Sequence, residues 1–244
     1  MIGNEALHSR LESSIEPKLI GMELVRLGLE RGRTAREAVD VMTGLISEYG
    51  QGKFGNYADV LYDNGYIVAD PTEAYVIETA GHDWAVKRVE SALGISNVYS
   101  VEADYESVSD SAEALARENG WWQSSERFSF ADAFTKESRE TGSGAMRRRR
   151  SCAVLGSADG EIGVDMMMSL LGDHSDASEP NEPLQTGINP GSGICAHFRH
   201  DENGKVISGN TAASLVADLC GDGSRLPVYW CSFYSPCLSV FYPV

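Results

Sequence analysis

The stretch PKLIGMELVRLGLERGRTAREAVDVMTGLISEYGQG, residues 17–52, decides the fold, because it predicts two consecutive amphipathic helices. In its first half, apolar residues recur at helical spacing, and the pattern stops at Gly32, a residue type that commonly follows the last turn of a helix. The apolar stripe of this helix consists of Leu19, Ile20, Met22, Leu24 and Leu27. We therefore expect a helix from Pro17 to the residue before Gly32.

The second half of the stretch carries a start signal for another helix. Thr34 and Glu37 have the spacing of a capping box, in which a hydroxyl and a carboxylate satisfy backbone N–H groups of the first turn. The predicted buried stripe of this helix is Ala38, Met42, Leu45, Ile46 and Tyr49. Two helices joined by a tight turn are thus expected over residues 17–50.

The hydrophobic period changes after this pair. In ADVLYDNGYIVAD the dipeptide Asn64-Gly65 lies between apolar runs, which is the strongest short signal for a hairpin turn. The following EAYVIETAGHDWAVKRVE contains two strand-like runs, split at Gly81. A set of antiparallel strands is therefore predicted over residues 56–102.

The remaining sequence predicts further layers of helix and strand within a single domain, residues 1–244. We expect residues 103–175 to be mainly helical, residues 176–193 to form an acidic, proline-rich loop, and residues 194–244 to contain strands and a helix. A helix pair, strands, helices and strands again indicate the α+β class.

The charge of the chain excludes several partners. Acidic residues outnumber basic ones by 36 to 20, and the formal net charge is −16. Such a surface repels nucleic acid and anionic membranes. The N-terminus lacks a basic segment followed by an apolar run, and no window approaches a membrane span. We therefore expect a cytoplasmic protein that binds neither nucleic acid nor membrane.

The cysteines favour neither a disulfide framework nor a zinc signature. The chain has five of them, an odd number without CxxC spacing. Cys195, His197 and His200 suggest a metal cluster, but no further ligand stands at a familiar spacing, so core or surface roles are favoured. Neither a metal nor a cofactor is predicted.

Two other motifs lack their structural context. GSGICA, residues 191–196, matches the dinucleotide fingerprint formally. However, a polar proline-containing loop precedes it, where the fingerprint requires a strand, and a strand-like run follows, where it requires a helix. The G-x-S-x-G elbow of the serine hydrolases does not occur. The sequence thus favours neither nucleotide binding nor a serine-hydrolase triad.

Four consecutive arginines, residues 147–150, stand out in this acidic chain. On a helix, Arg147 and Arg150 share a face, while Arg148 and Arg149 point elsewhere. The neighbouring TGSGAM and SCAVLG lack the aromatic residues typical of a nucleic-acid surface. Spacing alone favours a solvated helix face. The alternative is a carboxylate site, because a guanidinium group binds a carboxylate bidentately and keeps its charge.

Six separated parts of the chain carry a resemblance. They are IGNEAL, GMELVRLGLERGRTAREAVDVMTGLISEYGQG, EAYVIETAGHDWAVKRV with GISNVYSV, GSGICAH, NTAASLVADL and PVYWCSFYSPCLSVFYPV. Taken together and in this order, they resemble the secernins and the related cysteine dipeptidases of bacteria and archaea. These proteins are a branch of the N-terminal-nucleophile hydrolases.

The resemblance implies a fold and a chemistry. The fold is an αββα sandwich, in which two antiparallel sheets pack between helical layers. The reaction is hydrolysis of a dipeptide or small amide. An N-terminal cysteine thiolate attacks the carbonyl group, the cysteine's own α-amine acts as base, and hydrogen-bond donors hold the oxyanion.

The resemblance also implies roles for individual residues. Asn97, in GISNVYS, falls where these hydrolases place an asparagine whose amide faces the oxyanion; the alternative is a turn asparagine after Gly94. The arginine run falls where relatives carry an active-site arginine near the nucleophile. Arg147 is the first match to that arginine and Arg150 the second.

One departure from the family pattern affects the expected activity. The family's cysteine begins the mature chain, upstream of the IGNEAL stretch, whereas here no cysteine precedes Cys152. The family's C-terminal helical part also has no counterpart after FYPV. We expect a sandwich that is incomplete at both ends and a chain that is inactive alone. The alternative is a non-catalytic interaction or regulatory protein, with a homo-oligomer as one form.

Overall fold

The computed structural model describes residues 1–11, 18–52, 62–136, 138–158, 162–174, 193–200 and 202–244. The chain mixes helices with antiparallel sheets, in agreement with the α+β prediction. It forms two compact units. The first unit consists of Met1–Ser91 and Ile95–Glu140, and the second of Ala92–Gly94 and Thr141–Val244. The single domain expected from the sequence stays a prediction.

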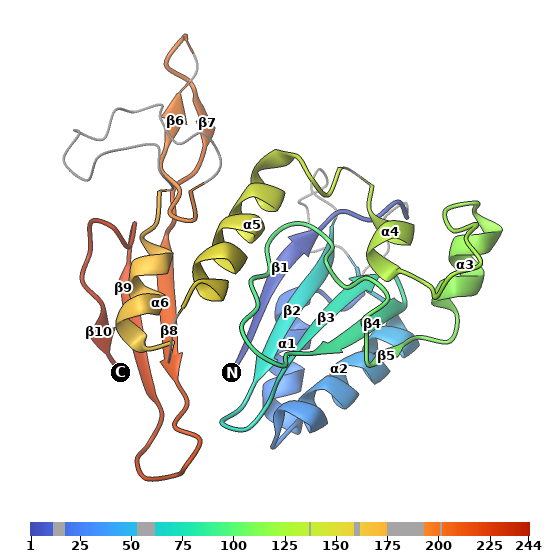
Figure 1. Ribbon diagram of the computed structural model, residues 1–244, viewed down its shortest axis with the longest axis horizontal. Coiled ribbons are helices and arrows are strands. Elements are labelled where there is room, and N and C mark those ends of the chain that lie inside the picture. The colour runs from blue at the N-terminus through green and yellow to red at the C-terminus, as the bar shows by residue number, and fades with distance from the viewer. Residues whose placement is uncertain (12–17, 53–61, 137, 159–161, 175–192, 201) are drawn as a thin grey trace. The chain divides into compact units, whose positions relative to one another are not determined.

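The first unit is built on a five-stranded antiparallel sheet with the order β1-β2-β3-β4-β5 (Figure 1). Successive side chains of a strand point to opposite faces of the sheet. Neighbouring residues of the central strands are buried, so both faces of the sheet are covered there. The strands are β1 (Ile2–Leu7), β2 (Asp63–Ala69), β3 (Ala74–Ala80), β4 (Asp83–Arg88) and β5 (Ser107–Val108).

The hairpin turn predicted at Asn64-Gly65 is wrong. Both residues lie inside β2, where Asn64 pairs with Ala6 of β1 and Gly65 lies between β1 and β3. The turn comes after β2, where one carboxylate oxygen of Asp70 accepts hydrogen bonds from the N–H groups of Thr72 (2.7 Å) and Glu73 (3.0 Å). Pairing with strands on both sides overrides the local preference of Asn-Gly for a turn.

Helices α1 (Gly21–Arg31) and α2 (Ala35–Tyr49) confirm the predicted pair, with Gly32 in the link. The Thr34 hydroxyl accepts a hydrogen bond from the N–H of Glu37 (3.1 Å), as the capping box predicts. The Glu37 carboxylate instead accepts from the N–H of Arg33 (2.8 Å), one residue earlier than expected.

The predicted stripes of the two helices are only partly correct. Leu19 and Ile20 precede α1, and Met22 is 48% exposed. On α2 the prediction fails for Tyr49, which is 49% exposed. The buried residues of the two stripes are Leu24, Leu27, Ala38, Met42 and Ile46.

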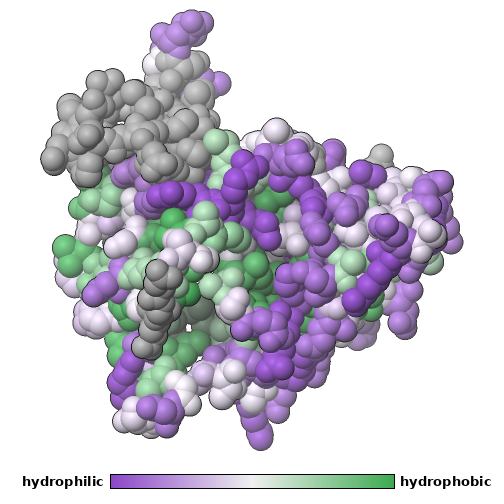
Figure 2. Space-filling view, in the orientation of Figure 1, coloured by the Kyte–Doolittle hydropathy of each residue, from purple (hydrophilic) through white to green (hydrophobic). Residues whose placement is uncertain are grey.

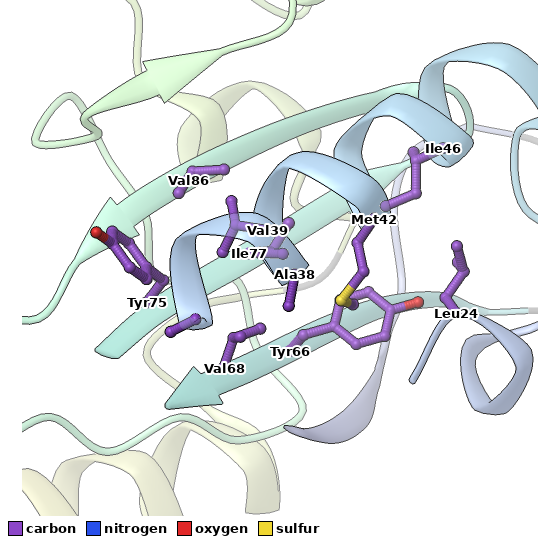
Figure 3. Close-up of a cluster of buried hydrophobic side chains, with 11 residues drawn as sticks. Leu24, Ala38, Val39, Met42, Ile46, Tyr66, Val68, Tyr75, Ile77 and Val86 are labelled. Atoms are coloured by element: carbon purple, nitrogen blue, oxygen red, sulfur yellow. The ribbon is translucent and has the colours of Figure 1, made fainter. Parts of the chain in front are cut away.

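The main core of the first unit lies between these helices and one face of the sheet (Figures 1 and 3). Side chains of α2 point toward the strands, and Tyr66, Ile77 and Val86 meet them from β2, β3 and β4 (Figure 3). Fully burying a large apolar side chain stabilises the fold by about 1.5–3 kcal/mol. This layer therefore carries much of the stability of the unit.

A second, aromatic cluster also belongs to the first unit. Phe130 and Phe134 of α4 (Phe130–Phe134) are fully buried, with ring centroids 4.6 Å apart. Phe128 and the two tryptophans Trp121 and Trp122 make edge contacts around them. Helix α3 (Ala112–Glu118) precedes this cluster. Both helices lie in the region 103–175, which is expected to be mainly helical.

In its described residues, the second unit contains two helices, a three-stranded sheet with the order β10-β9-β8, and the pair β6-β7. In residues 194–244 the described part consists of strands and turns, so the helix expected there is not found in it. The acidic loop expected at 176–193 lies outside the described residues, apart from Gly193. The elements are α5 (Gly142–Gly156), α6 (Val164–Leu171), β6 (Arg199–His200), β7 (Val206–Ser208), β8 (Ala213–Asp218), β9 (Val228–Phe233) and β10 (Tyr242–Pro243).

The second unit buries few apolar side chains. Hydrophobic groups reach the surface in the region of α6 and β8–β10 (Figures 1 and 2). The exposed ones include Leu226, Phe233, Leu238, Val240 and Tyr242. Across the described part of the chain, the helices are too short or too polar to cross a lipid bilayer.

Candidate functional site

The arginine run lies on α5, as the sequence predicts. Arg149 is exposed, whereas Arg147, Arg148 and Arg150 are half-buried. The helix therefore has a wet side at Arg149 and a more enclosed side that includes Arg147 and Arg150. This pattern agrees with the predicted separation of Arg147 and Arg150 from Arg149, although Arg148 is more enclosed than expected.

Arg150 binds a carboxylate within its own unit. Its Nε and one terminal nitrogen donate to the two oxygens of Asp173, at 3.0 and 2.7 Å. Such a two-pronged contact is the strongest form of the arginine–carboxylate pair. The carboxylate seen on Arg150 is thus that of Asp173, a residue that directly follows the cap of α6.

Asn97 is held against the first strand of the sheet. It is the exposed middle residue of a tight turn, in which Ser96 and Val98 form a bridge. Its side-chain Nδ2 donates to the carbonyl oxygen of Ala6 on β1, at 3.0 Å. Asn97 is therefore a turn residue, which is the alternative to an oxyanion donor in the sequence analysis. The contact with Ala6 also restrains the direction of its amide, and an oxyanion donor needs such a restraint.

Asn97 lies in the first unit and the arginines in the second. The common role that the sequence suggests for Asn97, Arg147 and Arg150 stays a prediction.

The structure adds a buried polar network that the sequence analysis missed. The Asn64 side chain donates to the Gln51 side chain (2.7 Å) and accepts from that of Asn4 (2.9 Å). The Thr79 hydroxyl accepts from the Asn64 N–H (3.1 Å) and donates to the Asn64 carbonyl (2.7 Å). The helix α1 starts directly on this network, since a Cβ on Gly21 would meet the Asn64 amide. Asn64 thus joins β2 to its two neighbouring strands and to Gln51 after α2, and its Asn-Gly context concealed that role.

Four side chains of the second unit form a cluster of sulfur and imidazole groups: His174, Cys195, His197 and Cys237. Their ligand atoms all lie within 4.8 Å of one another. Cys195 is buried, the histidines are half-buried, and Cys237 is exposed. Cys195 and His197 are two members of the metal cluster that the sequence suggests. The structure brings them to two residues from distant parts of the chain.

The third member of the sequence-based group is His200, on β6. Its side chain lies outside the described residues. His174 and Cys237 could not be found by spacing, because the segments that bring them to the Cys-Ala-His stretch are far apart in sequence. The cluster is the part of the described structure that could hold a metal ion.

The protonation of the cluster follows from its burial. Burial lowers the pKa of His197, and the neighbouring His174 lowers it further. Burial raises the pKa of Cys237 to about 12, with contributions from the hydrogen bond and charge of Cys195. Both shifts favour uncharged side chains, and neutral imidazole is the form of histidine that binds metal ions.

Comparison with known families gives one match. A family model described as peptidase family C69 matches residues 11–148. The matched region is more than half of the chain and includes α1, α2, Asn97 and Arg147. It ends before Arg150 and before the sulfur–imidazole cluster.

Proposed function

The chain belongs to peptidase family C69, a family of peptide hydrolases, and we propose that it derives from a dipeptidase-like amide hydrolase of the cysteine type. The observation that carries this proposal is the family match over residues 11–148. The resemblance to the secernins and cysteine dipeptidases agrees with it. The proposed substrate is a dipeptide or another small amide.

The proposed reaction proceeds through a thioester. The thiolate of an N-terminal cysteine attacks the amide carbonyl and forms a tetrahedral oxyanion. The C–N bond then breaks, and the leaving amine takes the proton that the cysteine's α-amine accepted. Water next attacks the thioester, which releases the acid and restores the thiol. Because no cysteine precedes Cys152, we propose that these 244 residues do not carry out this reaction alone.

Asn97 is the proposed oxyanion donor. Catalysis of this kind depends on hydrogen-bond donors that already point to the position where negative charge develops. The contact between the Asn97 amide and the Ala6 carbonyl supports this role, because it restrains the side chain on a strand of the sheet. The exposure of Asn97 leaves it accessible to a substrate.

Arg147 is the proposed substrate-binding arginine. A dipeptide carries a free carboxylate, which a guanidinium group recognises well. Arg147 is half-buried on α5 and lies inside the matched region, whereas Arg150 lies outside it. These observations favour Arg147 over Arg150 for the substrate.

We also propose that the complete fold is an αββα sandwich. The first unit supports this proposal, because its antiparallel sheet carries the helices α1 and α2 on one face, which supplies one helical layer and one sheet of such a sandwich (Figure 1).

A dipeptide panel tests the proposed function. We expect no turnover from the 244-residue chain, and turnover from a product extended by the in-frame coding sequence that precedes Met1, if that sequence supplies an N-terminal cysteine. Replacing all five cysteines of the printed chain with serine is the control. Robust turnover that survives this replacement would exclude a cysteine nucleophile.

The alternative proposal is a non-catalytic interaction protein derived from the same family. Within the described residues β1 is an outer strand of its sheet. Outer strands offer unpaired backbone groups to another chain. This alternative predicts a stable homo-oligomer or complex. Sedimentation that shows only a folded monomer, with no partner, would count against it, and a stop codon directly upstream of Met1 would favour it.

A further inference from the structure

We propose that His174, Cys195, His197 and Cys237 bind a zinc ion that holds the second unit together. This site is independent of the proposed peptidase reaction. It lies outside the residues that match the family, and it uses none of the residues assigned to catalysis.

The three distances among Cys195, His197 and Cys237 fit a tetrahedral zinc site. Zinc bonds of about 2.3 Å to sulfur and about 2.0–2.1 Å to nitrogen require ligand atoms about 3.3–3.8 Å apart. The Sγ atoms of Cys195 and Cys237 are 3.6 Å apart. The Nε2 atom of His197 lies 3.6 Å from Cys195 Sγ and 3.3 Å from Cys237 Sγ.

The distance between the two imidazole groups is shorter. The Nε2 atoms of His174 and His197 are 2.9 Å apart, the length of an N–H···N hydrogen bond. A small separation of the two rings is enough to admit an ion, and His197 already turns its Nε2 atom toward both sulfurs.

The types of ligand and their total charge favour zinc. Two sulfurs and two imidazoles are a common structural ligand set for zinc, which accepts both ligand types. A bound zinc ion deprotonates its thiol ligands, so two thiolates neutralise its double charge. The nearby carboxylate of Asp173 is balanced by Arg150, which leaves the cluster itself electrically neutral.

The segments that carry the ligands are held close by backbone contacts. The carbonyl oxygen of Asp173, next to His174, accepts hydrogen bonds from the N–H groups of Ile194 (2.8 Å) and Cys195 (3.0 Å). Gly193 packs so closely that a Cβ there would lie 2.9 Å from the Cα of His174. These contacts fix His174 beside Cys195 without help from an ion.

The second unit has a physical need for such a site. Its buried aliphatic and cysteine side chains, within the described residues, are Ala145, Leu155, Leu170, Cys195 and Val216. Units with so small a core are commonly stabilised by disulfides or metal ions. All five cysteines are thiols, so disulfides do not fill that role. A zinc ion would tie the end of α6 to the Cys195 segment and to the turn after β9.

Four protein ligands also define the kind of site. Catalytic zinc ions keep one position open for water or substrate, whereas structural ions are fully enclosed by protein ligands. The proposed ion is therefore structural, and the exposed Cys237 leaves a path by which it enters.

Metal analysis of the full chain tests the proposal. Purified chain, reduced and then equilibrated with zinc, should retain one zinc ion per chain after dialysis. Mutation of a residue that hydrogen-bonds to a metal ligand typically lowers metal affinity about 10–100-fold. Cys195→Ser and His197→Ala remove a ligand itself, so each should lower the affinity for zinc by more than this. Cys231→Ser, on β9 and outside the cluster, is the matched control and should keep full zinc content.

Cobalt provides a readout that needs no variant. Cobalt in place of zinc should give intense visible bands of a tetrahedral site and thiolate-to-cobalt absorption, and a chelator should abolish both and lower the thermal midpoint. The proposal is overturned if the reduced native chain takes up neither ion, or if zinc content is the same in the control and both ligand variants. A disulfide between Cys195 and Cys237 that persists in place of metal uptake would overturn it as well.

Discussion

At the scale of single residues, identical neighbours differ by their position on a helix. Arg149 faces solvent, Arg150 binds Asp173, and Arg147 is half-buried inside the family-matched region. A sequence run of four equal side chains conceals these differences. The helical period separates them, and the structure confirms that separation for Arg147, Arg149 and Arg150.

The first prediction concerns this run in a catalytically competent, N-terminally extended product. Arg147→Ala should lower kcat/KM for a dipeptide by about 10- to 100-fold, because a charge-assisted contact to the substrate carboxylate contributes roughly 1.5–3 kcal/mol. Arg149→Ala should change it less than about threefold, as expected of a solvated charge. Steady-state kinetics measures both, and equal effects would refute the assignment of Arg147.

Asp70 gives a prediction about pH. Burial disfavours its charged form, but hydrogen bonds from the N–H groups of Ala35, Thr72 and Glu73 outweigh burial and lower the pKa to about 2. The folded pKa is therefore below the unfolded value of about 3.9. Stability from this group is complete above the unfolded pKa and is lost as the pH falls from about 4 to about 2.

The measurement compares the native chain with Asp70→Asn in urea. The native chain should be the more stable one at neutral pH, and the difference should shrink below about pH 4 as Asp70 is protonated. A difference that stays constant down to about pH 2 would show that the charge of Asp70 does not stabilise the fold.

At the scale of elements, α2 connects the sequence signal most directly to the fold. Its capping threonine, its apolar spacing and the Asp70 contact to its first turn all agree. Its buried stripe packs on the sheet through Met42, Val39 and Ile46 (Figure 3). Agreement between local and tertiary preferences explains why this helix is predictable.

Two methionines test this packing. Met42→Ala should destabilise the first unit by about 2–5 kcal/mol, because it opens a cavity in the core. Met22→Ala, at a site that is 48% exposed, is the matched control and should cost less than about 1 kcal/mol. Denaturant unfolding gives both values. Similar losses in the two variants would contradict the packing of α2 on the sheet.

Other elements could not be predicted from local sequence. Asn64-Gly65 has the composition of a turn but lies in β2, because strands on both sides pair with it. Its side chain joins the buried network with Gln51 and Thr79, which no spacing rule reveals. Pairing with the neighbouring strands therefore determined the structure at Asn64-Gly65, and the local preference for a turn did not.

At the scale of the whole molecule, six stretches that occur in the same order as in the family indicated the family. The family model confirms it over residues 11–148. The sulfur–imidazole cluster illustrates the opposite case. His174 and Cys237 meet Cys195 and His197 only through the folding of the second unit, so the sequence favoured no metal site. Sites assembled from distant segments need the fold before they can be identified.

Dipeptide hydrolysis tests the central proposal most directly, namely that this chain derives from a hydrolase that acts through an N-terminal cysteine. Release of amino acids should be measured side by side for the 244-residue chain, for the variant with all five cysteines replaced by serine, and for the extended product with an N-terminal cysteine. Turnover by the extended product alone, lost when that cysteine becomes alanine, is the predicted result. Equal turnover by the chain and by its cysteine-free variant would contradict the claim.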